Sequence, residues 1–365
     1  MHLLVTTDTV GGVWTYTREL VRGLVSRGHK VSLISFGNWP TKDQLAWLSD
    51  LPEVHYRPTH YGLEWMQDAA QDIDQSIEYL CSLVRELNPD LLHFNQFAYG
   101  SLPVNLPRIV VAHSDVLSWW SAVYGVPPPD NEWFRWYIGL VSNGLNNATA
   151  VVAPSRTMLR ALKSNFNISA ETTVIHNGRD PDLFRNNRAQ KNGIMSVGRL
   201  WDQAKQVTLL MQQRHSAPLK LVGPVTESLA TSPVSLVGEG EIQFLGQRSE
   251  SDLCRLLAET AIYAATSQYE PFGLAPLEAA LSGCALVTND IPAFHEVWGD
   301  AALYFRRNDP KNLAECIELL VQNPHLRNQY AERAYLRARE NFTADMMVDR
   351  YEALYRQAIS LGACA

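Results

Sequence analysis

Short apolar runs alternate with longer segments of helical periodicity along the chain. The first apolar run, 2–7, ends at the turn sequence DTVGG and is typical of a buried parallel strand. Segment 12–30 carries apolar residues at helical spacing, with Gly28 where a helix C-terminal glycine belongs, and a second apolar run follows at 30–37. Strand, glycine turn, helix and strand in this order predict the opening of a doubly wound parallel sheet.

The same alternation continues and then restarts after a polar stretch. Strands are predicted at 90–96, 108–115, 148–155, 193–200, 219–224, 242–247, 261–267 and 284–290, with helices at 66–87 and 155–165 and between the later strands. The polar stretch predicts a linker over 176–192, between an N-terminal domain at 1–175 and a C-terminal domain at 193–342. The last helix, 343–365, is expected to pack back on the first domain.

Composition narrows the class of protein. A chain of 365 residues is too long for one ordinary core, and 46% hydrophobic with 19% charged residues is typical of a globular protein. A net charge of -7 argues against nucleic acid as a partner. Five scattered cysteines, and an N-terminus without a basic start or a cleavage site, predict reduced thiols and a cytoplasmic location.

Segment 267–290, SQYEPFGLAPLEAALSGCALVTND, places two acids among small apolar residues. Glu270 lies in the predicted loop at the carboxyl end of a strand, and Pro276 predicts a helix start that puts Glu278 in the first helical turn. Gly273 lets the backbone approach a ligand closely, and the unpaired N–H groups of a helix start attract an anion such as phosphate. A helix N-terminus flanked by acids therefore predicts a ligand with both phosphates and hydroxyls.

That ligand class is the nucleotide sugars, whose hydroxyls would donate hydrogen bonds to the two glutamates. The alternative is that Glu278 only complements the helix dipole and Glu270 is a solvated loop acid. The segment alone leaves both interpretations open.

The stretch EPFGLAPLEAALSG resembles the signature of a large family of retaining, metal-independent glycosyltransferases, in which two glutamates stand eight positions apart (glycosyltransferase family four, group 1 glycosyltransferases). Four more segments are similar to that family's pattern: DTVGGVWTY, VVAHSD, VIHNGRDPDLF (against V-x-x-N-G-V-D-x-x-x-F) and VGRL followed by a lysine. Ordered matches over roughly 280 residues are far more specific than any single motif. The resemblance implies the α/β GT-B fold, two Rossmann-like doubly wound domains that face each other across a cleft.

The resemblance also implies a role for each matching position. Glu270 would bind donor-sugar hydroxyls, Glu278 the ribose, and Arg199 with Lys205 the diphosphate. The expected donor-binding set is Gly11, Gly12, Arg199, Lys205, Glu270, Phe272, Gly273, Leu274 and Glu278, where the backbone N–H groups of 272–274 contact the sugar and distal phosphate. The expected catalytic set is His113, Glu270, Arg199 and Lys205.

Arg199 and Lys205 also have a physical case of their own. A departing nucleoside diphosphate gains negative charge, which two cations would stabilise in place of a metal. The lysine stands six residues after the arginine here, where the family has five, so its match is less close. The alternative is a pair of solvated surface cations.

Gly12 and His113 are expected on the N-terminal side of the reaction. Any doubly wound domain needs a tight turn after its first strand, but Gly12 would also bring backbone to the donor. A strand-end histidine is more often structural than catalytic; the resemblance implies that His113 orients sugar and acceptor and stabilises oxocarbenium-like charge.

The sequence gives less information about the acceptor-binding site than about the donor-binding site. Trp119 and Trp120 belong to an aromatic stretch, 117–137, that would line an acceptor site, rest at a membrane interface or, as we favour, pack under a long loop. Two D-x-D strings, at 72–74 and 180–182, lie in a helical pattern and in the linker, so no metal site is expected.

The sequence thus predicts a retaining, metal-independent glycosyltransferase without a cofactor. It would transfer a hexose-type sugar from a UDP- or GDP-linked donor to a hydroxyl acceptor, a saccharide or glycoconjugate. The alternatives are a non-catalytic sugar-nucleotide-binding protein of this fold, or a sugar-nucleotide epimerase. The sequence does not indicate membrane association but leaves it open, and it leaves the oligomeric state open as well.

Overall fold

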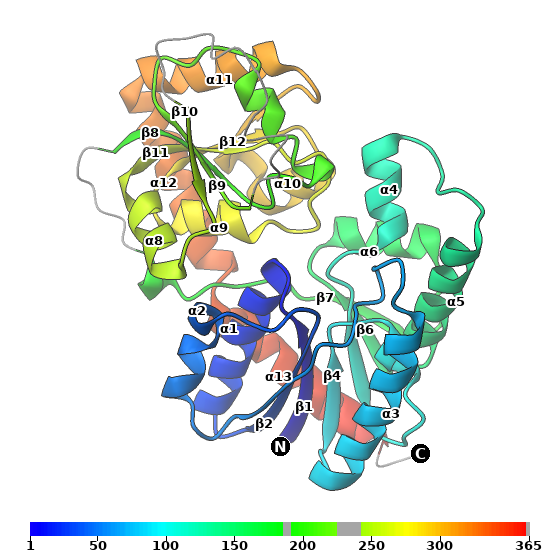
Figure 1. Ribbon diagram of the computed structural model, residues 1–365. Coiled ribbons are helices and arrows are strands. Elements are labelled where there is room, and N and C mark those ends of the chain that lie inside the picture. Colours follow the sequence, from blue (N-terminus) through cyan, green and yellow to red (C-terminus); the bar gives the residue numbers. More distant parts are fainter. Residues whose placement is uncertain (185–190, 225–241, 363–365) are drawn as a thin grey trace. The chain divides into compact units, whose positions relative to one another are not determined.

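The computed structural model describes residues 1–184, 191–224 and 242–362 (Figure 1). Contacts divide the chain into two compact units. Unit 1 is Met1–Gly178 with Ala344–Ala365, and unit 2 is Arg179–Thr343. Part of the predicted linker, residues 185–190, lies outside the described residues.

Unit 1 contains a parallel sheet of seven strands in the part of the chain that the structure describes, in the order β3-β2-β1-β4-β5-β6-β7. The strands are β1 (His2–Asp8), β2 (Lys30–Phe36), β3 (His55–Pro58), β4 (Leu91–Phe94), β5 (Arg108–Val111), β6 (Ala150–Ala153) and β7 (Glu171–Val174). All residues of β4 and β6 are buried, as expected for strands covered on both faces.

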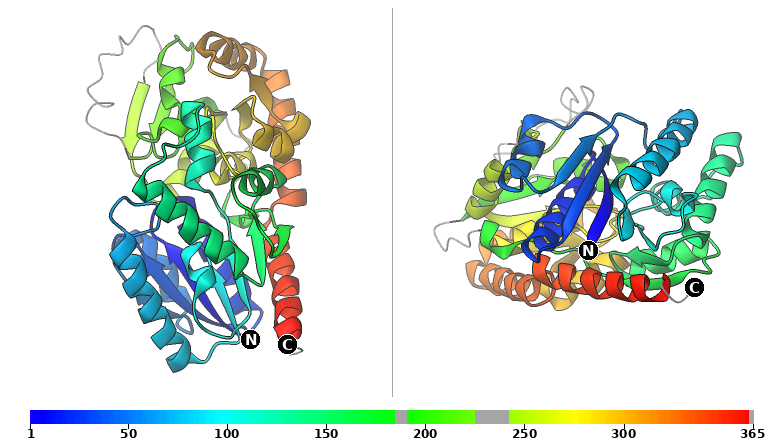
Figure 2. Two further views of the ribbon diagram at one scale, coloured as in Figure 1. Left: turned by 90° about the vertical axis from the view of Figure 1, so that its right-hand side faces the viewer. Right: turned by 90° about the horizontal axis from the view of Figure 1, so that it is seen from below.

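Helices of unit 1 flank this sheet (Figures 1 and 2). They are α1 (Gly12–Ser26), α2 (Lys42–Leu45), α3 (Ala70–Leu87), α4 (Val116–Tyr124), α5 (Glu132–Asn146), α6 (Arg156–Asn165) and α13 (Ala344–Gly362), with 3-10 turns η1 (Ala46–Asp50) and η2 (Ala98–Ser101). The last helix, α13, lies beside α1, where Gly23 of α1 allows close approach to Val348. Figure 2 shows α13, in red, along one side of unit 1.

Unit 2 repeats the design with six parallel strands among the described residues, in the order β10-β9-β8-β11-β12-β13. The strands are β8 (Asn192–Val197), β9 (Leu219–Val222), β10 (Ile242–Gly246), β11 (Thr260–Ala265), β12 (Ala285–Asn289) and β13 (Leu303–Phe305). The helices are α8 (Glu250–Glu259), α9 (Leu274–Leu281), α10 (Pro292–Trp298), α11 (Pro310–Gln322) and α12 (Pro324–Asn341), with 3-10 turns η3 (Pro181–Leu183), η4 (Gln203–Lys205), η5 (Val207–Met211) and η6 (Gly299–Ala301).

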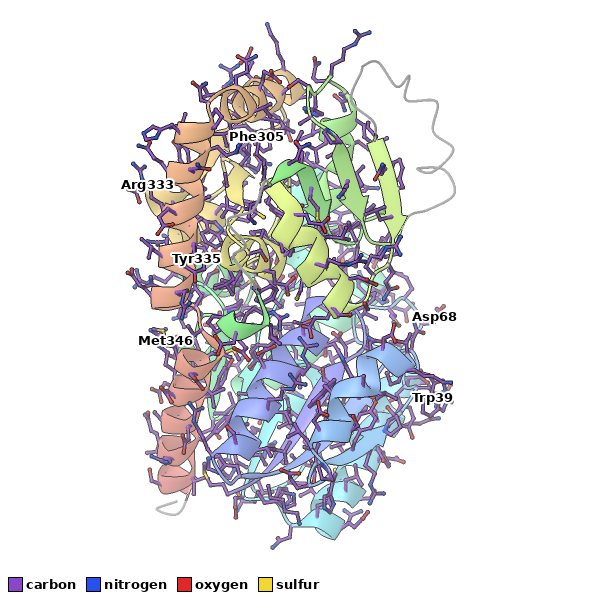
Figure 3. All side chains as sticks on the ribbon, turned by 90° about the vertical axis from the view of Figure 1, so that its left-hand side faces the viewer. Trp39, Asp68, Phe305, Arg333, Tyr335 and Met346 are labelled. Carbon is purple, nitrogen blue, oxygen red and sulfur yellow. The ribbon has the colours of Figure 1, made fainter. Side chains whose placement is uncertain are left out.

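Two apolar cores cover the two faces of the unit 2 sheet. Met195 belongs to the core under α9, α10 and α12, whereas its neighbour Ile194 belongs to the core under η5 and α11. Successive strand residues point to opposite faces, so β8 is covered on both sides. Helix α12 buries Ala334 against the first core, while Figure 3 shows Arg333 and Tyr335 pointing away from it.

Three strands that the sequence pattern does not predict are present. These are β3, β7 and β13, and each lies at an edge of its sheet. Residues of β3 and β7 are mostly exposed or half-buried, so they lack the continuous apolar run of a central strand. Strands of this kind are recognised from their neighbours and not from their own residues.

Helix α9 begins earlier than predicted. It starts at Leu274 after Gly273, whose φ of 94° is a left-handed conformation that favours glycine, and not at Pro276. The expectation that Glu278 lies in the first helical turn was therefore wrong, because Glu278 is the fifth residue of the helix. Pro276, as the third, has no N–H, so it removes one of the donors that a helix start normally presents.

Both sheets reverse their strand order next to their first strand. In unit 1 the reversal lies between β1 and β4, and in unit 2 between β8 and β11. Open α/β sheets bind ligands outside the carboxyl ends of the strands at such a switch point. The segments that follow these four strands contain most of the predicted site residues.

Candidate functional site

The loops after β8 and β11 of unit 2 meet in one ion pair. The Lys205 ammonium lies 2.6 Å from Oε2 of Glu270, and the Ser267 hydroxyl donates to the same oxygen at 3.1 Å. Only 23% of the Lys205 side chain and 14% of the Glu270 side chain are exposed. The structure therefore brings together a predicted diphosphate cation and the predicted sugar-binding carboxylate.

Backbone contacts hold these two loops against each other. Thr266 donates its hydroxyl to the carbonyl of Lys205 at 2.6 Å, and the N–H of Gln268 donates to Ala204 at 2.8 Å. The residues that separate Lys205 from Arg199 include the short turn η4, capped by Asp202. The six-residue spacing is accommodated in this turn, and Lys205 reaches Glu270.

Arg199 follows β8 and lies beside a carboxylate that the sequence did not single out. Its guanidinium donates to Oδ2 of Asp202 at 2.8 Å, and its central carbon lies 5.5 Å from the centre of the Trp201 ring. The other oxygen of Asp202 accepts the N–H of Ala204. Asp202 lies between Arg199 and Lys205 in the sequence. This position inside the motif is the one signal by which the sequence could have identified it as a site residue.

The start of α9 presents backbone, not side chains. Phe272 is buried in the core of unit 2, with its ring 5.4 Å from that of Phe342. A Cβ on Gly273 would lie 3.3 Å from Cγ of Glu270, so this glycine keeps the backbone close to the carboxylate. The predicted contacts of 272–274 with a ligand are main-chain contacts, and they stay a prediction.

Glu278, the second glutamate of the signature, is part of a buried ionic group. Nε of Arg179 lies 2.9 Å from Oε1 of Glu278, and the same guanidinium donates to Oε1 of Glu250 at 2.6 Å. The Arg179 side chain is 1% exposed. Burial raises the pKa of Tyr263, and the charges of Glu270 and Glu278 raise it further.

Residues at the carboxyl ends of β1 and β5 carry the predicted site of unit 1. Gly11 caps α1 with a φ of 78°, and Gly12 is the first residue of that helix; both are exposed. Nε2 of His113 lies 2.8 Å from Oδ1 of Asn95, whose amide nitrogen donates to the Thr6 carbonyl at 2.6 Å. Because the amide nitrogen donates, Oδ1 must accept, and the neutral His113 ring carries its proton on Nε2.

Burial, and then the neighbouring His93, lower the pKa of His113 to about 3. His113 is therefore neutral at physiological pH. The ring of Tyr16 packs edge-on at 4.5 Å. Asn95 was not predicted as a site residue, although it directly follows the apolar run of β4.

Other predicted residues have structural partners. Trp120 packs against Phe134 at 5.3 Å and Trp119 against Tyr124 at 5.8 Å, both in the α4–α5 region of unit 1. Asp72 and Asp180, from the two D-x-D strings, each accept a backbone N–H.

The described residues hold neither a cluster of metal ligands nor a helix that could span a membrane. No group of three or more His, Cys, Asp or Glu side chains there is placed to hold a metal ion. Over the same residues, every helix is too short or too polar to span a bilayer.

Two family models match almost the whole chain in succession. Residues 10–183 match the model described as Glycosyltransferase Family 4, and residues 180–337 match Glycosyl transferases group 1. The chain belongs to this family of glycosyltransferases, as the sequence resemblance indicated.

Curated relatives match over part of their length. The O-antigen chain mannosyltransferase RfbU of Salmonella typhimurium is 26% identical over 192 residues, which are 51% of this chain and 54% of that protein. An N-acetylgalactosaminyltransferase of Campylobacter jejuni that acts on N,N'-diacetylbacillosaminyl-diphospho-undecaprenol, by its name, is 29% identical over 148 residues, 40% of this chain and 39% of that protein. The chain thus spans about half the length of these relatives, or less.

Solved structures match over the full length. Sucrose-phosphate synthase from Thermosynechococcus elongatus superposes with a TM-score of 0.82 at 18% identity, covering 99% of this chain and 100% of that one. The Anabaena protein HepE, in complex with UDP and glucose, gives 0.76 at 18% identity, covering 98% and 100%. These similarities confirm the predicted α/β GT-B fold.

Proposed function

We propose that this chain is a retaining, metal-independent glycosyltransferase. It transfers a hexose from a UDP- or GDP-linked donor to a hydroxyl of a saccharide or glycoconjugate. The observation that carries the proposal is the Lys205–Glu270 ion pair next to Gly273, with Arg199 after the neighbouring strand. Cations for a diphosphate and an acceptor for sugar hydroxyls thus come from adjacent loops of unit 2.

The two cations would stabilise the departing diphosphate. Arg199 and Lys205 are each oriented by a carboxylate, Asp202 and Glu270 respectively, before any ligand arrives. Charge that is already oriented costs little reorganisation when negative charge develops on the leaving group. Glu270 would then accept hydrogen bonds from donor-sugar hydroxyls, and Glu278 from the ribose.

His113 would act without exchanging a proton. Its neutral ring has Nε2–H committed to Asn95, so it suits orienting the sugar and acceptor better than acid catalysis. In a front-face reaction the bond from the anomeric carbon to the diphosphate oxygen breaks, and the acceptor oxygen bonds on the same face. The acceptor's proton passes to the departing phosphate oxygen, which requires no protein base.

Names of relatives and neighbours support the donor and acceptor classes. HepE is described in complex with UDP-glucose, and RfbU is named for O-antigen chains.

A thermal-shift screen across UDP-, GDP- and ADP-sugars would identify the donor, because a ligand at 100 times its Kd stabilises the folded protein by about 2.7 kcal/mol. Transfer of radiolabelled sugar to an acceptor pool, with the anomeric configuration read by NMR, would then test the reaction; binding without transfer or hydrolysis would refute it.

Metal independence has its own test. Transfer should continue at an unchanged rate in excess EDTA, because Arg199 and Lys205 supply the positive charge at the diphosphate. Loss of activity in EDTA that magnesium or manganese restores would contradict this part of the proposal.

A further inference from the structure

A buried ionic triad of Arg179, Glu250 and Glu278 lies in unit 2. Arg179 is the first residue of the unit, Glu250 the first residue of α8, and Glu278 lies in the second turn of α9. The Arg179 side chain is 1% exposed, that of Glu278 12% and that of Glu250 34%. A guanidinium this deeply buried requires charged partners, and the triad supplies two.

The main chain and an aromatic ring fix Arg179 independently of the carboxylates. Its N–H donates to the Phe342 carbonyl at 3.1 Å, and its guanidinium carbon lies 5.1 Å from the centre of the Phe184 ring. The residue also forms a backbone bridge to Thr343. Several contacts thus fix the position of Arg179, and its guanidinium in turn orients the two carboxylates.

Glu278 has a different status in this triad from Glu250. Glu278 is more deeply buried than Glu250, so loss of the contact with Arg179 would cost its carboxylate more free energy. Arg179 therefore restricts the orientation of Glu278 more than that of Glu250. Nε of Arg179 meets Oε1 of Glu278. A carboxylate has about four acceptor positions, so a carboxylate that pairs with a guanidinium can also accept hydrogen bonds from a vicinal diol.

We propose that Arg179 is the positioning residue for nucleotide-ribose recognition: it orients the Glu278 carboxylate so that this group accepts hydrogen bonds from the ribose hydroxyls of the donor. The inference rests on the proposed function, in which Glu278 holds the ribose. It adds that a residue outside the signature segment sets how strongly the site selects ribose over deoxyribose. The motif VIHNGRDPDLF has Arg179 where the family pattern quoted above has valine. The proposed positioning role is therefore specific to chains that, like this one, have arginine at that position.

The test compares binding of ribonucleotides with that of 2′-deoxyribonucleotides. Dissociation constants for UDP against 2′-deoxy-UDP, and GDP against 2′-deoxy-GDP, are measured by calorimetry, and the base that binds more tightly is used. A hydrogen bond to a charged group predicts that the wild-type protein prefers the ribonucleotide about 10- to 100-fold. In Arg179→Met this preference should fall below about threefold.

Two further variants separate orientation from general damage. Glu250→Gln removes the charge of the other carboxylate but keeps an acceptor for Arg179, and should leave the preference within about twofold of wild type. Arg179→Lys keeps a charge but lacks the planar fork that meets both carboxylates, so the preference should fall at least about threefold. The lysine variant decides the question if Arg179→Met does not fold, as judged by circular dichroism.

Each result has one meaning. A wild-type preference retained in a folded Arg179 variant overturns the inference, as does a Glu250→Gln effect as large as that of Arg179→Met. If the wild-type protein binds nucleoside diphosphates without preferring ribose, the inference fails while the proposed function stands. If it binds no nucleoside diphosphate or nucleotide sugar, the proposed function fails first.

Discussion

At the scale of single residues, the candidate site is organised by carboxylates that face cations. Glu270 meets Lys205, Asp202 meets Arg199, and Glu278 meets Arg179. The glutamates that looked misplaced in an apolar segment are therefore paired, as buried charges must be. Each pair orients its groups for a ligand that carries both phosphates and hydroxyls.

Replacing Glu270 by glutamine should show how much of its contribution to catalysis comes from its negative charge and how much from its size. Glu270→Gln keeps the size of the side chain but weakens the contacts to Lys205 and to donor hydroxyls. Hydrogen bonds to a charged group contribute about 1.5–3 kcal/mol, so kcat should fall about 10- to 100-fold. Steady-state kinetics would measure this, with Ser267→Ala as the control that loses only a neutral donor to the same oxygen. An unchanged kcat would remove Glu270 from the catalytic residues.

The two histidines His93 and His113 should make unit 1 sensitive to acid. Burial lowers the pKa of both His93 and His113 to about 3, below the value of about 6.5 in an unfolded chain. The unfolded chain therefore binds more protons below pH 6.5, and stability present above that pH is lost as pH falls toward 3. Each histidine contributes a slope of about 1.4 kcal/mol per pH unit.

Glu64 acts in the opposite direction, because burial raises its pKa to about 7 and its folded form takes up a proton first. The decisive measurement is therefore a difference between proteins. The free energy of unfolding of His93→Gln, measured between pH 4 and pH 6, should depend on pH less steeply than that of the wild type by about 1.4 kcal/mol per unit. Equal slopes would show that His93 is not held neutral.

At the scale of elements, the packing of α13 against α1 depends on a missing side chain. A Cβ on Gly23 would lie 2.5 Å from Cγ2 of Val348, a clash that a stiff β-branched residue relieves poorly. Gly23→Ala should destabilise by about 1–3 kcal/mol despite the better helix propensity of alanine. Thermal denaturation would measure the change.

A second substitution checks the cause of that change. In a Val348→Ala background the clash is gone, so Gly23→Ala should be neutral or stabilising there. Additive losses in the double variant would show that α1 and α13 do not meet at this point.

At the scale of the whole molecule, the donor should protect the carboxyl ends of the strands at the switch point of unit 2. Amide hydrogen exchange with a saturating nucleotide sugar should slow at 198–205 and 267–278. The edge strand β10 serves as the internal control and should not change. Protection confined to other segments would place the ligand elsewhere.

The order of strands and helices was largely predictable because it depends on local patterns. Buried parallel strands are continuous apolar runs, and helices repeat their apolar residues every three or four positions, so both can be read without the fold. Edge strands β3, β7 and β13 lack that signal. The start of α9 was mispredicted because a left-handed glycine at 273, which the residue type permits but does not require, outweighed Pro276 as the helix start.

The sequence by itself determined the family, the α/β class, and the glutamates, cations and histidine of the candidate site, because these lie in motifs whose members are close along the chain. Only the tertiary structure decided which groups meet: Arg179 with a glutamate 99 positions later, Asn95 with His113, and Lys205 with Glu270 across 65 positions. The last two pairs form because parallel strands distant in sequence end at one edge of a sheet. Which side chains become partners depends on which strands end next to each other in the sheet. Patterns of neighbouring residues in the sequence do not contain that information.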